Sequence, residues 1–409
     1  MTDKNLYNCL KERGLLYQCT DEKRLQEILE SGEPITLYEG SDPTADSLHI
    51  GHCVPYCILR RFQKAGHKVI LLMGGATACI GDPSGKNEMR KIMDKETIAQ
   101  NIEKIKDSLK IFLDFDGENP AIIVNNADWF ENLNYVDFMR EVGVHFNISK
   151  MLSNEIYANR IKEGGLTLFE LGYMPMQAYD FIHLNKKYGC TLQYGGGDQW
   201  GNIVAGVELA RKLNYKEGTT NKSLEGFTNP LLTNYEGKKM GKTEKGALWV
   251  DAKKTTPYEF YQYFYNVDDK DVEKVMKLLT RLSLDEIKNY LSGDIRVAKK
   301  VMAYEITKLV HGKLEADKVL ETVNNIFNNA NFENMPSIEL NITGDVNVID
   351  LLVDAKQFSS RSEARRMIEQ GGITIDDEKV TDFKQILPKK SEYIIKKGKK
   401  TYLKVINKN

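Results

Sequence analysis

Short apolar runs alternate with stretches of helical periodicity through about the first 225 residues of the chain. This alternation constrains the fold more than any other feature, because it predicts a mostly parallel sheet with crossover helices. Strands are expected at residues 35–38, 68–73, 121–124 and 190–194, and helices at 49–65, 94–113, 135–141, 173–187 and 199–213. The sequence therefore predicts an α/β fold with a Rossmann-like parallel sheet.

The rest of the chain changes character twice. From about residue 257 the strand patterns stop and charged, leucine-rich helical periodicity follows, so an α-helical domain is expected at 247–330. Residues 331–347 are polar and rich in turn formers, which predicts a linker. Residues 348–409 are expected to form a small α+β domain. A chain of 409 residues needs such a division, since single cores stop growing at about 250–300 residues.

Charge is unevenly placed along the chain, although the formal net charge is only −1. Residues 345–409 hold 14 lysines and arginines against 10 acidic residues, a local net charge of +4. The residues before them carry −5, and this asymmetry is typical of a terminal module that meets a polyanion. The C-terminal region is therefore expected to bind nucleic acid.

The sequence lacks targeting and metal-binding patterns. The apolar stretch at 69–81 is too short and too interrupted by glycine to span a bilayer, and the first residues lack the apolar core of a signal peptide. The six cysteines form no Cys-x-x-Cys pair. We expect a cytoplasmic protein with reduced thiols, no membrane partner and no structural metal.

A first chemical pattern lies at residues 43–52, between the first expected strand and the helix that follows it. Free backbone N–H groups at a helix start attract phosphate, and Gly51 permits a close backbone approach. His49 and His52 can each donate a hydrogen bond to a phosphate or ribose oxygen. Taken alone, the segment is better explained as two ordinary histidines that cap a helix.

A second pattern follows at 238–243, in a polar, glycine-containing stretch suited to a loop. Its lysines can clamp a triphosphate, although a solvated basic turn is the commoner meaning of such a loop. The two patterns in this order resemble the signature pair of class I aminoacyl-tRNA synthetases. The first is an intact HIGH at 49–52, and the second is a KMSKS variant at 239–243.

Further segments narrow this resemblance. Residues 37–44, 74–86, 173–180 and 195–202 are similar to tyrosyl-tRNA synthetases, and they occur in the order of that family. The resemblance covers essentially the whole chain. The chain is therefore identified as a member of the bacterial-type tyrosyl-tRNA synthetases.

The resemblance implies a class I tyrosine–tRNA ligase. Such an enzyme activates L-tyrosine with ATP to tyrosyl-adenylate and pyrophosphate, and then transfers tyrosine to the 3′-terminal adenosine of its tRNA. Residues 1–246 would form the catalytic, nucleotide-binding domain, and residues 247–330 would help to hold the anticodon arm. The expected partners are L-tyrosine, ATP and the tyrosine tRNA, with a homodimer as the assembly. Mg²⁺ would be carried by ATP or pyrophosphate.

The resemblance also assigns residues to an amino-acid pocket. Recognition of a phenol over a phenyl ring requires buried polar partners for one hydroxyl group, and Tyr38 and Asp180 would supply them. The other tyrosine-binding residues would hold the ammonium and carboxylate groups or support the pocket: Asp82, Tyr173, Gln177, Gln199 and Asn126.

A second set of residues would handle ATP. In-line attack of the tyrosine carboxylate on the α-phosphorus requires no general base, so catalysis would rest on positioning and charge stabilisation. The catalytic residues implied by the resemblance are Thr44, His49, His52, Lys239, Lys242 and Thr243. The other ATP-binding residues are Asp42, Gly51, Lys86, Arg90 and Asp198.

The C-terminal region resembles the alpha-L (S-four type) RNA-binding domain. Ser360 or Ser362 can cap a helix that presents three arginines, and a basic cluster follows at 396–400. A charged helix face without a ligand has the same pattern. The residues expected to contact tRNA are Arg361, Arg365, Arg366, Lys396, Lys397, Lys399 and Lys400.

The sequence departs from the family pattern at Glu39 and Ser41, which place an acid next to the expected nucleotide region. Glu39 alternates in direction with Tyr38, so it could face the ribose, solvent or a neighbouring lysine.

The main alternative function is a catalytically inactive, synthetase-like RNA-binding protein, and the intact signatures argue against it. A tryptophanyl-tRNA synthetase is disfavoured by Tyr38, Asp180 and the C-terminal domain. A small nucleotidyltransferase with the same HIGH motif would not need the domains that follow.

Overall fold

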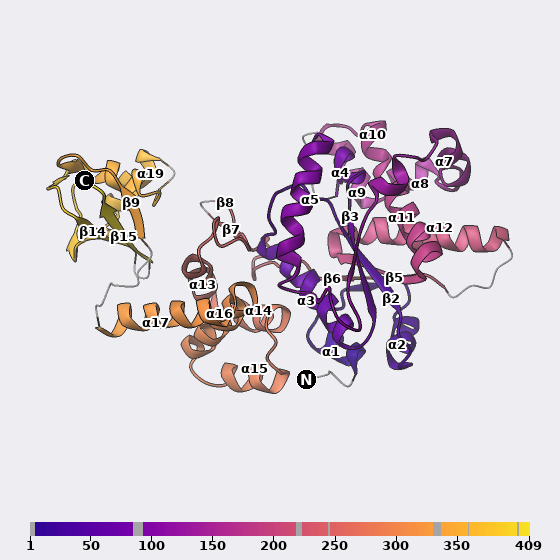
Figure 1. Cartoon of the computed structure of the whole chain (residues 1–409), viewed down its shortest axis with the longest axis horizontal. Coiled ribbons are helices and arrows are strands. Elements are labelled where there is room, and N and C mark those ends of the chain that lie inside the picture. Colours follow the sequence, from indigo (N-terminus) through magenta and orange to yellow (C-terminus); the bar gives the residue numbers. More distant parts are fainter. Residues whose placement is uncertain are drawn as a thin grey trace. The chain divides into compact units, whose positions relative to one another are not determined.

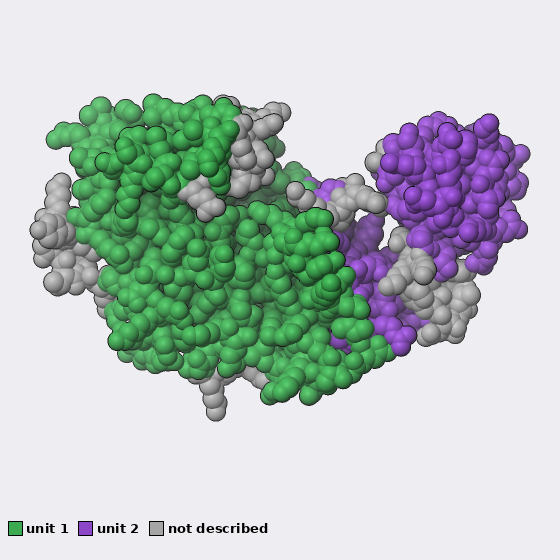
Figure 2. Space-filling view, turned by 180° about the vertical axis from the view of Figure 1, so that it is seen from behind, with its two compact units in different colours: residues 1–241, 249–251, 268–295 green, residues 242–248, 252–267, 296–409 purple. Residues whose placement is uncertain are grey.

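The structure, a computed structural model, describes seven ranges of the chain: residues 5–84, 93–217, 223–243, 246–329, 337–358, 360–398 and 401–409. These residues fall into two compact units (Figure 2). Unit 1 comprises residues 1–241, 249–251 and 268–295. Unit 2 comprises residues 242–248, 252–267 and 296–409.

A six-stranded sheet forms the centre of unit 1 (Figure 1). The strands lie in the order β1, β6, β5, β2, β3, β4, and each pair of neighbours is parallel apart from β1 and β6. Their bounds are β1 Gln18–Cys19, β2 Thr36–Ser41, β3 Lys68–Met73, β4 Ile122–Asn125, β5 Cys190–Gly196 and β6 Glu225–Asn229. The predicted α/β fold with a parallel sheet is therefore confirmed.

The strand order reverses beside β2. The chain passes from β2 through β3 to β4 on one side, and it then places β5 and β6 on the other side. The central strands are buried on both faces, which explains the continuous apolar run of β3. In open sheets of this kind, ligands bind outside the carboxyl ends of the strands at such a reversal. The expected site is thus the edge where β2 and β5 end.

Helices cover both faces of this sheet (Figure 1). Tyr38 of β2 contacts Phe181 of α11, and α12 packs beside α11 on the same face. On the other face, Phe62 of α3 contacts Phe227 of β6. The helices of unit 1 that the structure describes are α1 Leu6–Glu12, α2 Glu22–Glu30, α3 Ile50–Lys64, α4 Thr77–Ile80, α5 Lys95–Leu109, α6 Ala127–Phe130, α7 Tyr135–Glu141, α8 Ile148–Leu152, α9 Glu155–Gly164, α10 Leu168–Leu171, α11 Tyr173–Tyr188, α12 Trp200–Glu217, α14 Val272–Leu279 and α15 Leu284–Leu291.

Unit 2 begins with short strands and helices. The antiparallel pair β7 Lys242–Thr243 and β8 Gly246–Ala247 precedes three helices, of which α13 packs against α17. The helices are α13 Pro257–Tyr265, α16 Ile295–His311 and α17 Lys313–Asn329. None of the helices in the described ranges combines the length and apolarity that a bilayer crossing requires.

The C-terminal part of unit 2 contains a five-stranded sheet in the order β12, β11, β14, β15, β9. Two helices, α18 Val348–Asp354 and α19 Arg361–Glu369, contribute to one apolar core with this sheet. The strands are β9 Ser337–Leu340, β11 Ile373–Ile375, β12 Glu378–Lys379, β14 Glu392–Lys397 and β15 Thr401–Asn407, with β10 Val346–Asn347 and β13 Ile386–Leu387 as a separate pair.

Two segments differ from the expected organisation. Strand β9 lies within the region assigned to a linker, because Ile338 and Leu340 alternate with polar residues and pack on the C-terminal core. Residues 268–295, assigned to the helical domain, lie in unit 1. The two units are defined by compactness, whereas the predicted domains are defined by function. The predicted domain boundaries at residues 246, 330 and 347 therefore stay predictions.

Candidate functional site

Helix α3 begins at the first signature. His49 is its N-cap, and His49 Nδ1 accepts a hydrogen bond from the Gly51 N–H at 3.1 Å. His52 Nδ1 accepts one from the His49 N–H at 3.2 Å, and the two imidazole rings stack with centroids 3.9 Å apart. A Cβ at Gly51 would lie 2.9 Å from the His49 ring, so this cap requires glycine.

The protonation state of His52 follows from this geometry. Burial, with a smaller contribution from His49, lowers the pKa of His52 to about 3, so the ring is neutral at physiological pH. Since Nδ1 accepts a hydrogen bond, the ring hydrogen lies on Nε2. His52 therefore offers one neutral N–H donor at the start of the helix.

The second signature lies on a hairpin formed by residues 232–241. The Met240 N–H donates to the Leu232 carbonyl oxygen at 2.8 Å, and Thr233 pairs with Lys239. Lys239 Nζ lies 3.3 Å from Asp198 Oδ2, which brings this hairpin to the carboxyl end of β5. A lysine and a carboxylate predicted to bind ATP therefore lie together.

Four residues predicted to handle ATP can be placed only partly or not at all. Lys242 and Thr243 form β7 in unit 2, and their side chains lie outside the described residues. Lys86 and Arg90 also lie outside the described residues. Their predicted contacts with ATP stay predictions.

A buried polar pair lies on the face of the sheet covered by α11. Tyr38 and Asp180 are 1% and 2% exposed. Asp180 Oδ1 accepts a hydrogen bond from Trp129 Nε1 at 2.9 Å, and Oδ2 accepts one from Asn126 Nδ2 at 3.2 Å. The Tyr38 hydroxyl has no hydrogen-bond partner within the described residues. Burial raises the pKa of Tyr38 and of Asp180, and the Asp180 charge raises that of Tyr38 further.

Hydrogen bonds continue from this pair to the end of β2. The fully buried Asn126 donates to Thr77 Oγ1 at 3.1 Å, and Thr77 donates to Asp42 Oδ1 at 2.8 Å. The Tyr173 hydroxyl donates to Asp42 Oδ2 at 3.0 Å. Asp42, predicted to bind ATP, thus holds a residue predicted to bind tyrosine. A Cβ at Gly74 would lie 2.1 Å from Asp42 Oδ1, so this turn also requires glycine.

The segments that follow α4 and β5 contribute a second connected group. Gln199 Nε2 donates to Asp82 Oδ2 at 2.7 Å, and Asp82 Oδ1 accepts hydrogen bonds from the backbone N–H and hydroxyl of Ser84. Asn202 donates to Gln199 Oε1 at 3.2 Å. Asp82, one of the residues predicted to bind the α-ammonium group, is therefore in direct contact with Gln199, predicted to bind the α-carboxylate group.

The remaining predicted residues follow local geometry. Tyr173, Gln177 and Asp180 are spaced by four and three residues along α11, so they share one helix face. Gln177 is half-buried, whereas Thr44 is exposed and its N–H donates to the Asp42 carbonyl oxygen at 2.8 Å.

Comparison with known proteins identifies the family. A family model described as tRNA synthetases class I (W and Y) matches residues 30–328, and one described as the tyrosine–tRNA ligase SYY-like C-terminal domain matches residues 328–405. The tyrosine–tRNA ligase of Clostridium kluyveri is 50% identical over 411 residues, which cover 98% of this chain and 99% of the relative. The chain belongs to the class I tyrosyl-tRNA synthetases. The family predicted from the signatures is confirmed.

Other members of the family agree with this assignment. The tyrosine–tRNA ligase of Fusobacterium nucleatum is 48% identical over 409 residues, covering 99% of this chain and 98% of the relative. The structure of a C-terminally truncated mitochondrial tyrosyl-tRNA synthetase from Aspergillus nidulans superposes with a TM-score of 0.70 at 30% identity. The superposed region covers 79% of this chain and 94% of the mitochondrial enzyme's chain.

Sequence reasoning did not single out three residues of the synthetase pocket. Trp129 donates a hydrogen bond to Asp180, and Thr77 donates one to Asp42. Gln193 pairs with Tyr38 across β5 and β2, so both side chains lie on one face of the sheet. Gln193 is 2% exposed, and its Oε1 has no partner in the described part of the chain. Thr77 lies in the family-like segment 74–86 but received no role there, whereas the positions of Trp129 and Gln193 depend on helix packing and sheet register.

Glu39 points to the opposite face of the sheet from Tyr38. It is buried, with 7% of its surface exposed, so its side chain does not face solvent. The Ser41 hydroxyl donates to Glu39 Oε1 at 2.9 Å and lies 3.4 Å from the Tyr56 hydroxyl. Glu39 Oε2 has no hydrogen-bond partner among the described residues. Burial raises the pKa of Glu39 to about 7, and the Ser41 hydrogen bond opposes part of this shift.

The predicted tRNA-binding helix is α19, which Ser360 caps by accepting a hydrogen bond from the Glu363 N–H. Arg361 forms an ion pair with Asp350 at 2.8 Å. Arg365 pairs with Glu369 at 2.8 Å and lies 4.1 Å from the Phe383 ring centroid, whereas Arg366 is exposed.

The basic residues of β14 make local contacts. Lys396 lies 5.2 Å from the Tyr402 ring centroid, and Lys397 donates to the Gln357 carbonyl oxygen at 3.1 Å. Lys399 and Lys400 lie outside the described residues.

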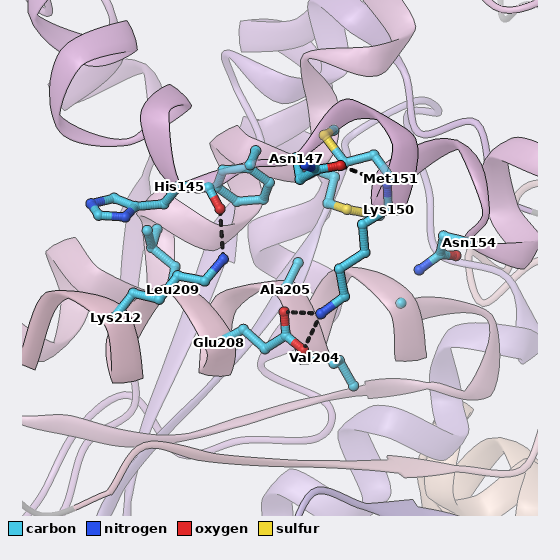
Figure 3. A pocket seen from close by; sticks show the side chains of 13 residues that line it. His145, Asn147, Lys150, Met151, Asn154, Val204, Ala205, Glu208, Leu209 and Lys212 are labelled. Atoms are coloured by element: carbon cyan, nitrogen blue, oxygen red, sulfur yellow. Dashed lines mark hydrogen bonds and ion pairs between the residues drawn. The ribbon is translucent and has the colours of Figure 1, made fainter. Parts of the chain in front are cut away.

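A separate pocket lies between the segment that leads into α8 and helix α12 (Figure 3). Lys150 Nζ contacts both carboxylate oxygens of Glu208 at 2.9 Å, and Lys212 donates to the His145 carbonyl oxygen at 2.6 Å. The residues predicted to bind tyrosine or ATP do not line this pocket.

Replacement of Glu39 by glutamine is expected to change how stability depends on pH. The folded protein raises the pKa of Glu39 from its ordinary 4.5 to about 7, so it retains a proton that the unfolded chain loses. This group therefore lowers the free energy of unfolding as pH rises from about 4.5 to 7, by about 3 kcal/mol in total, and contributes no further change above that range. Glutamine does not titrate, so the Glu39→Gln variant does not show this decrease in the free energy of unfolding.

Thermal unfolding of both proteins between pH 5 and 8 measures the effect. The unfolding midpoint of Glu39→Gln should rise relative to wild type as pH increases and then level off. A difference that stays constant across this pH range would contradict the burial of an ionisable Glu39.

Proposed function

We propose that the chain ligates L-tyrosine to the tyrosine tRNA in two steps, activation by ATP and transfer to the 3′-terminal adenosine. Family membership supports the reaction class. The observation that carries the choice of amino acid is the buried pair Tyr38 and Asp180, in which a hydroxyl group has no partner beside a carboxylate that is already oriented. An RNA-binding protein without catalysis would not need this pair.

A phenol hydroxyl satisfies both members of the pair at once. It can donate to Asp180, which accepts hydrogen bonds only, and it can accept from Tyr38. Phenylalanine would bury the same groups without a partner, at a cost of about 1–3 kcal/mol for each. Tyrosyl-tRNA synthetases themselves supply the reference value for such discrimination, about 10⁵.

The α-ammonium and α-carboxylate groups of tyrosine would be held by residues that follow α4 and β5. Asp82 supplies a carboxylate that suits a cation, and Gln199 supplies an amide N–H₂ that suits a carboxylate. Tyr173 and Gln177 lie on the same face of α11 as Asp180, so one helix would orient both ends of the amino acid. Asn126 would support the pocket through Asp180.

The nucleotide would lie between the two signatures. The N-terminus of α3 favours negative charge, Gly51 permits close approach, and the neutral His52 donates its Nε2–H. Thr44 and His49 would contact the triphosphate end, and Asp42 would lie close by. Asp198 would accept a hydrogen bond from the ribose once a ligand competes for Lys239.

Activation would be an in-line displacement. A tyrosine carboxylate oxygen bonds to the α-phosphorus while the bond to the bridging oxygen breaks, and pyrophosphate leaves with that electron pair. No proton moves, so charge on the leaving group is the main demand. Lys239, Lys242, Thr243, Lys86 and Arg90 would stabilise it.

Magnesium is proposed as a companion of ATP. In the ranges that the structure describes, no three histidine, cysteine, aspartate or glutamate side chains gather as a metal site. The steps above describe what the chain's own residues would do, and Mg²⁺ carried by ATP would add charge stabilisation at the phosphates.

The C-terminal domain would bind the tRNA backbone. Arg365 and Arg366 are exposed on α19, and Lys396 and Lys397 lie on β14 of the same domain. Arg361, Lys399 and Lys400 would add charge. We also propose the functional division 1–246, 247–330, 331–347 and 348–409, with the second segment at the anticodon arm.

The homodimer would form through an apolar face of unit 1. Most large apolar side chains that remain exposed in the described ranges come from α7 to α10 and the segments between them, and Ile122 on the edge strand β4 adds to them. Such a concentration is typical of a protein interface. These side chains are Tyr135, Val136, Met139, Val144, Ile148, Leu152, Ile161, Leu168 and Phe169.

The Tyr38→Phe variant tests the phenol pocket. Removing the hydroxyl leaves the substrate phenol with one partner fewer, so discrimination between tyrosine and phenylalanine should fall by about 3- to 10-fold. The measurement is kcat/KM for ATP–pyrophosphate exchange with each amino acid. Tyr194→Phe is the matched control, because its hydroxyl bonds to Asn229 on the opposite face. An unchanged ratio in Tyr38→Phe would contradict the proposal.

The Lys239→Ala variant tests charge stabilisation by the second signature. The rate of pyrophosphate exchange should fall by about 10²-fold, because a charge that acts on the leaving group is lost. Tyrosine binding in the absence of ATP should not change. Lys238→Ala is the control, since that side chain is exposed and pairs with Glu236. Equal losses in both variants would argue against a specific role for Lys239.

The dimer is tested by placing a charge on the apolar face. Leu168→Asp should convert the assembly to monomers at micromolar concentration, because a buried carboxylate without a partner opposes association. Light scattering coupled to size exclusion measures the mass. Leu314→Asp, at an exposed leucine of α17, is the control and should stay dimeric. A dimeric Leu168→Asp protein would move the interface elsewhere.

A further inference from the structure

The hairpin that carries Lys239 is contacted by a segment that no signature marks. Its two strands are closed by the Met240 N–H, which donates to Leu232, and by the Asn234 N–H, which donates to the Lys238 carbonyl oxygen at 2.9 Å. Thr233 pairs directly with Lys239. A group that holds Thr233 therefore also holds the backbone of the catalytic lysine.

Three side chains contact the hairpin, two from the short helix Asp269–Asp271 and one from the first turn of α14. Lys274 Nζ donates to both the carbonyl oxygen and Oγ1 of Thr233, each at 2.8 Å. Asp271 accepts a hydrogen bond from the Tyr235 backbone N–H. Lys270 Nζ lies 4.5 Å from the Tyr235 ring centroid. The hairpin is thus held at Thr233, which pairs with Lys239, and at Tyr235 in the turn.

These contacts are made by partly desolvated charges. Asp271 is 3% exposed, and burial raises its pKa above the ordinary value. Burial also lowers the pKa of Lys274, although Asp271 opposes this shift. Removing the Lys274 ammonium group from water costs free energy, and its two hydrogen bonds to Thr233 offset this cost.

The same helix is fixed to α3, which begins at the first signature. Val272, Val275 and Met276 are buried, and α14 packs against α3. Beyond the end of α14, Arg61 of α3 donates to the Thr280 carbonyl oxygen at 3.4 Å. Arg13 donates to the Lys277 and Leu282 carbonyl oxygens. Helix α14 therefore connects the helix of one signature to the hairpin of the other.

We propose that Lys274, together with Asp271, is a positioning residue for adenylate formation. It holds Thr233, and through it Lys239, at a set distance from the start of α3, so that both signatures reach one triphosphate. Lys274 touches no reacting group. This role rests on the proposed function, but Lys274 is not among the residues that the sequence predicted to bind tyrosine, ATP or tRNA.

Kinetics of the Lys274→Met variant test the proposal. Methionine keeps a similar length without the charge, so the hairpin loses its bonds at Thr233. The kcat for tyrosine-dependent pyrophosphate exchange should fall by about 10- to 100-fold through misplacement of Lys239. The dissociation constant of tyrosine, measured by equilibrium dialysis without ATP, should stay within twofold of wild type. Lys274→Arg, which restores two donors, should recover part of the rate.

Lys277→Met is the matched control. Lys277 lies one turn further along α14, and its side chain pairs with Glu273 rather than with the hairpin. This variant should keep the wild-type kcat. Equal rates in Lys274→Met and Lys277→Met, with wild-type exchange intact, would overturn the proposal and leave the proposed function standing. A loss of tyrosine affinity equal to the loss of kcat would also overturn it, because it would indicate general damage.

Amide hydrogen exchange provides a readout that does not depend on activity. The amides of Asn234 and Met240, bonded within the hairpin, should exchange faster in Lys274→Met than in wild type or Lys277→Met. Unchanged exchange would contradict the proposed tether. If wild type showed no tyrosine-dependent pyrophosphate exchange, the proposed function would fail, and the amide measurement would still decide whether Lys274 holds the hairpin.

Discussion

The structure of the candidate site depends on the burial of one carboxylate, that of Asp180. A carboxylate removed from water is stable only when donors replace its hydration, and Trp129 and Asn126 supply two of them. Asn126 is in turn connected through Thr77 to Asp42, so the orientation of Asp180 is linked to the end of β2. These hydrogen bonds fix the orientation of Asp180, which is the condition for selecting a substrate by one hydroxyl group.

The fold brings these groups together by topology. Because β2, β3, β4 and β5 are parallel, their carboxyl ends meet at one edge, and the reversal of strand order beside β2 opens that edge for a ligand. The N-terminus of α3 and the hairpin at 232–241 then supply the groups suited to a triphosphate. The proposed amino-acid pocket and the proposed nucleotide site are therefore two parts of one sheet edge. Helix α14 contacts both α3, which begins at the first signature, and the hairpin that carries Lys239.

Much of this arrangement follows from the sequence for identifiable reasons. Strands buried on both faces produce continuous apolar runs, and the glycines at Gly51 and Gly74 mark turns where a side chain would collide. The positions of Trp129, Gln193 and Lys274 could not be predicted. Each depends on which residues face one another after the sheet and helices have packed, and such register leaves no periodic pattern in the chain.

A crystal structure of the protein with bound tyrosine would test whether Tyr38 and Asp180 select the phenol of the substrate. The phenol oxygen should lie within about 3 Å of both the Tyr38 hydroxyl and an Asp180 oxygen, with Trp129 and Asn126 still bonded to Asp180. A tyrosine bound elsewhere, or bound here with its phenol pointing away from Tyr38 and Asp180, would show that this pair does not select the substrate.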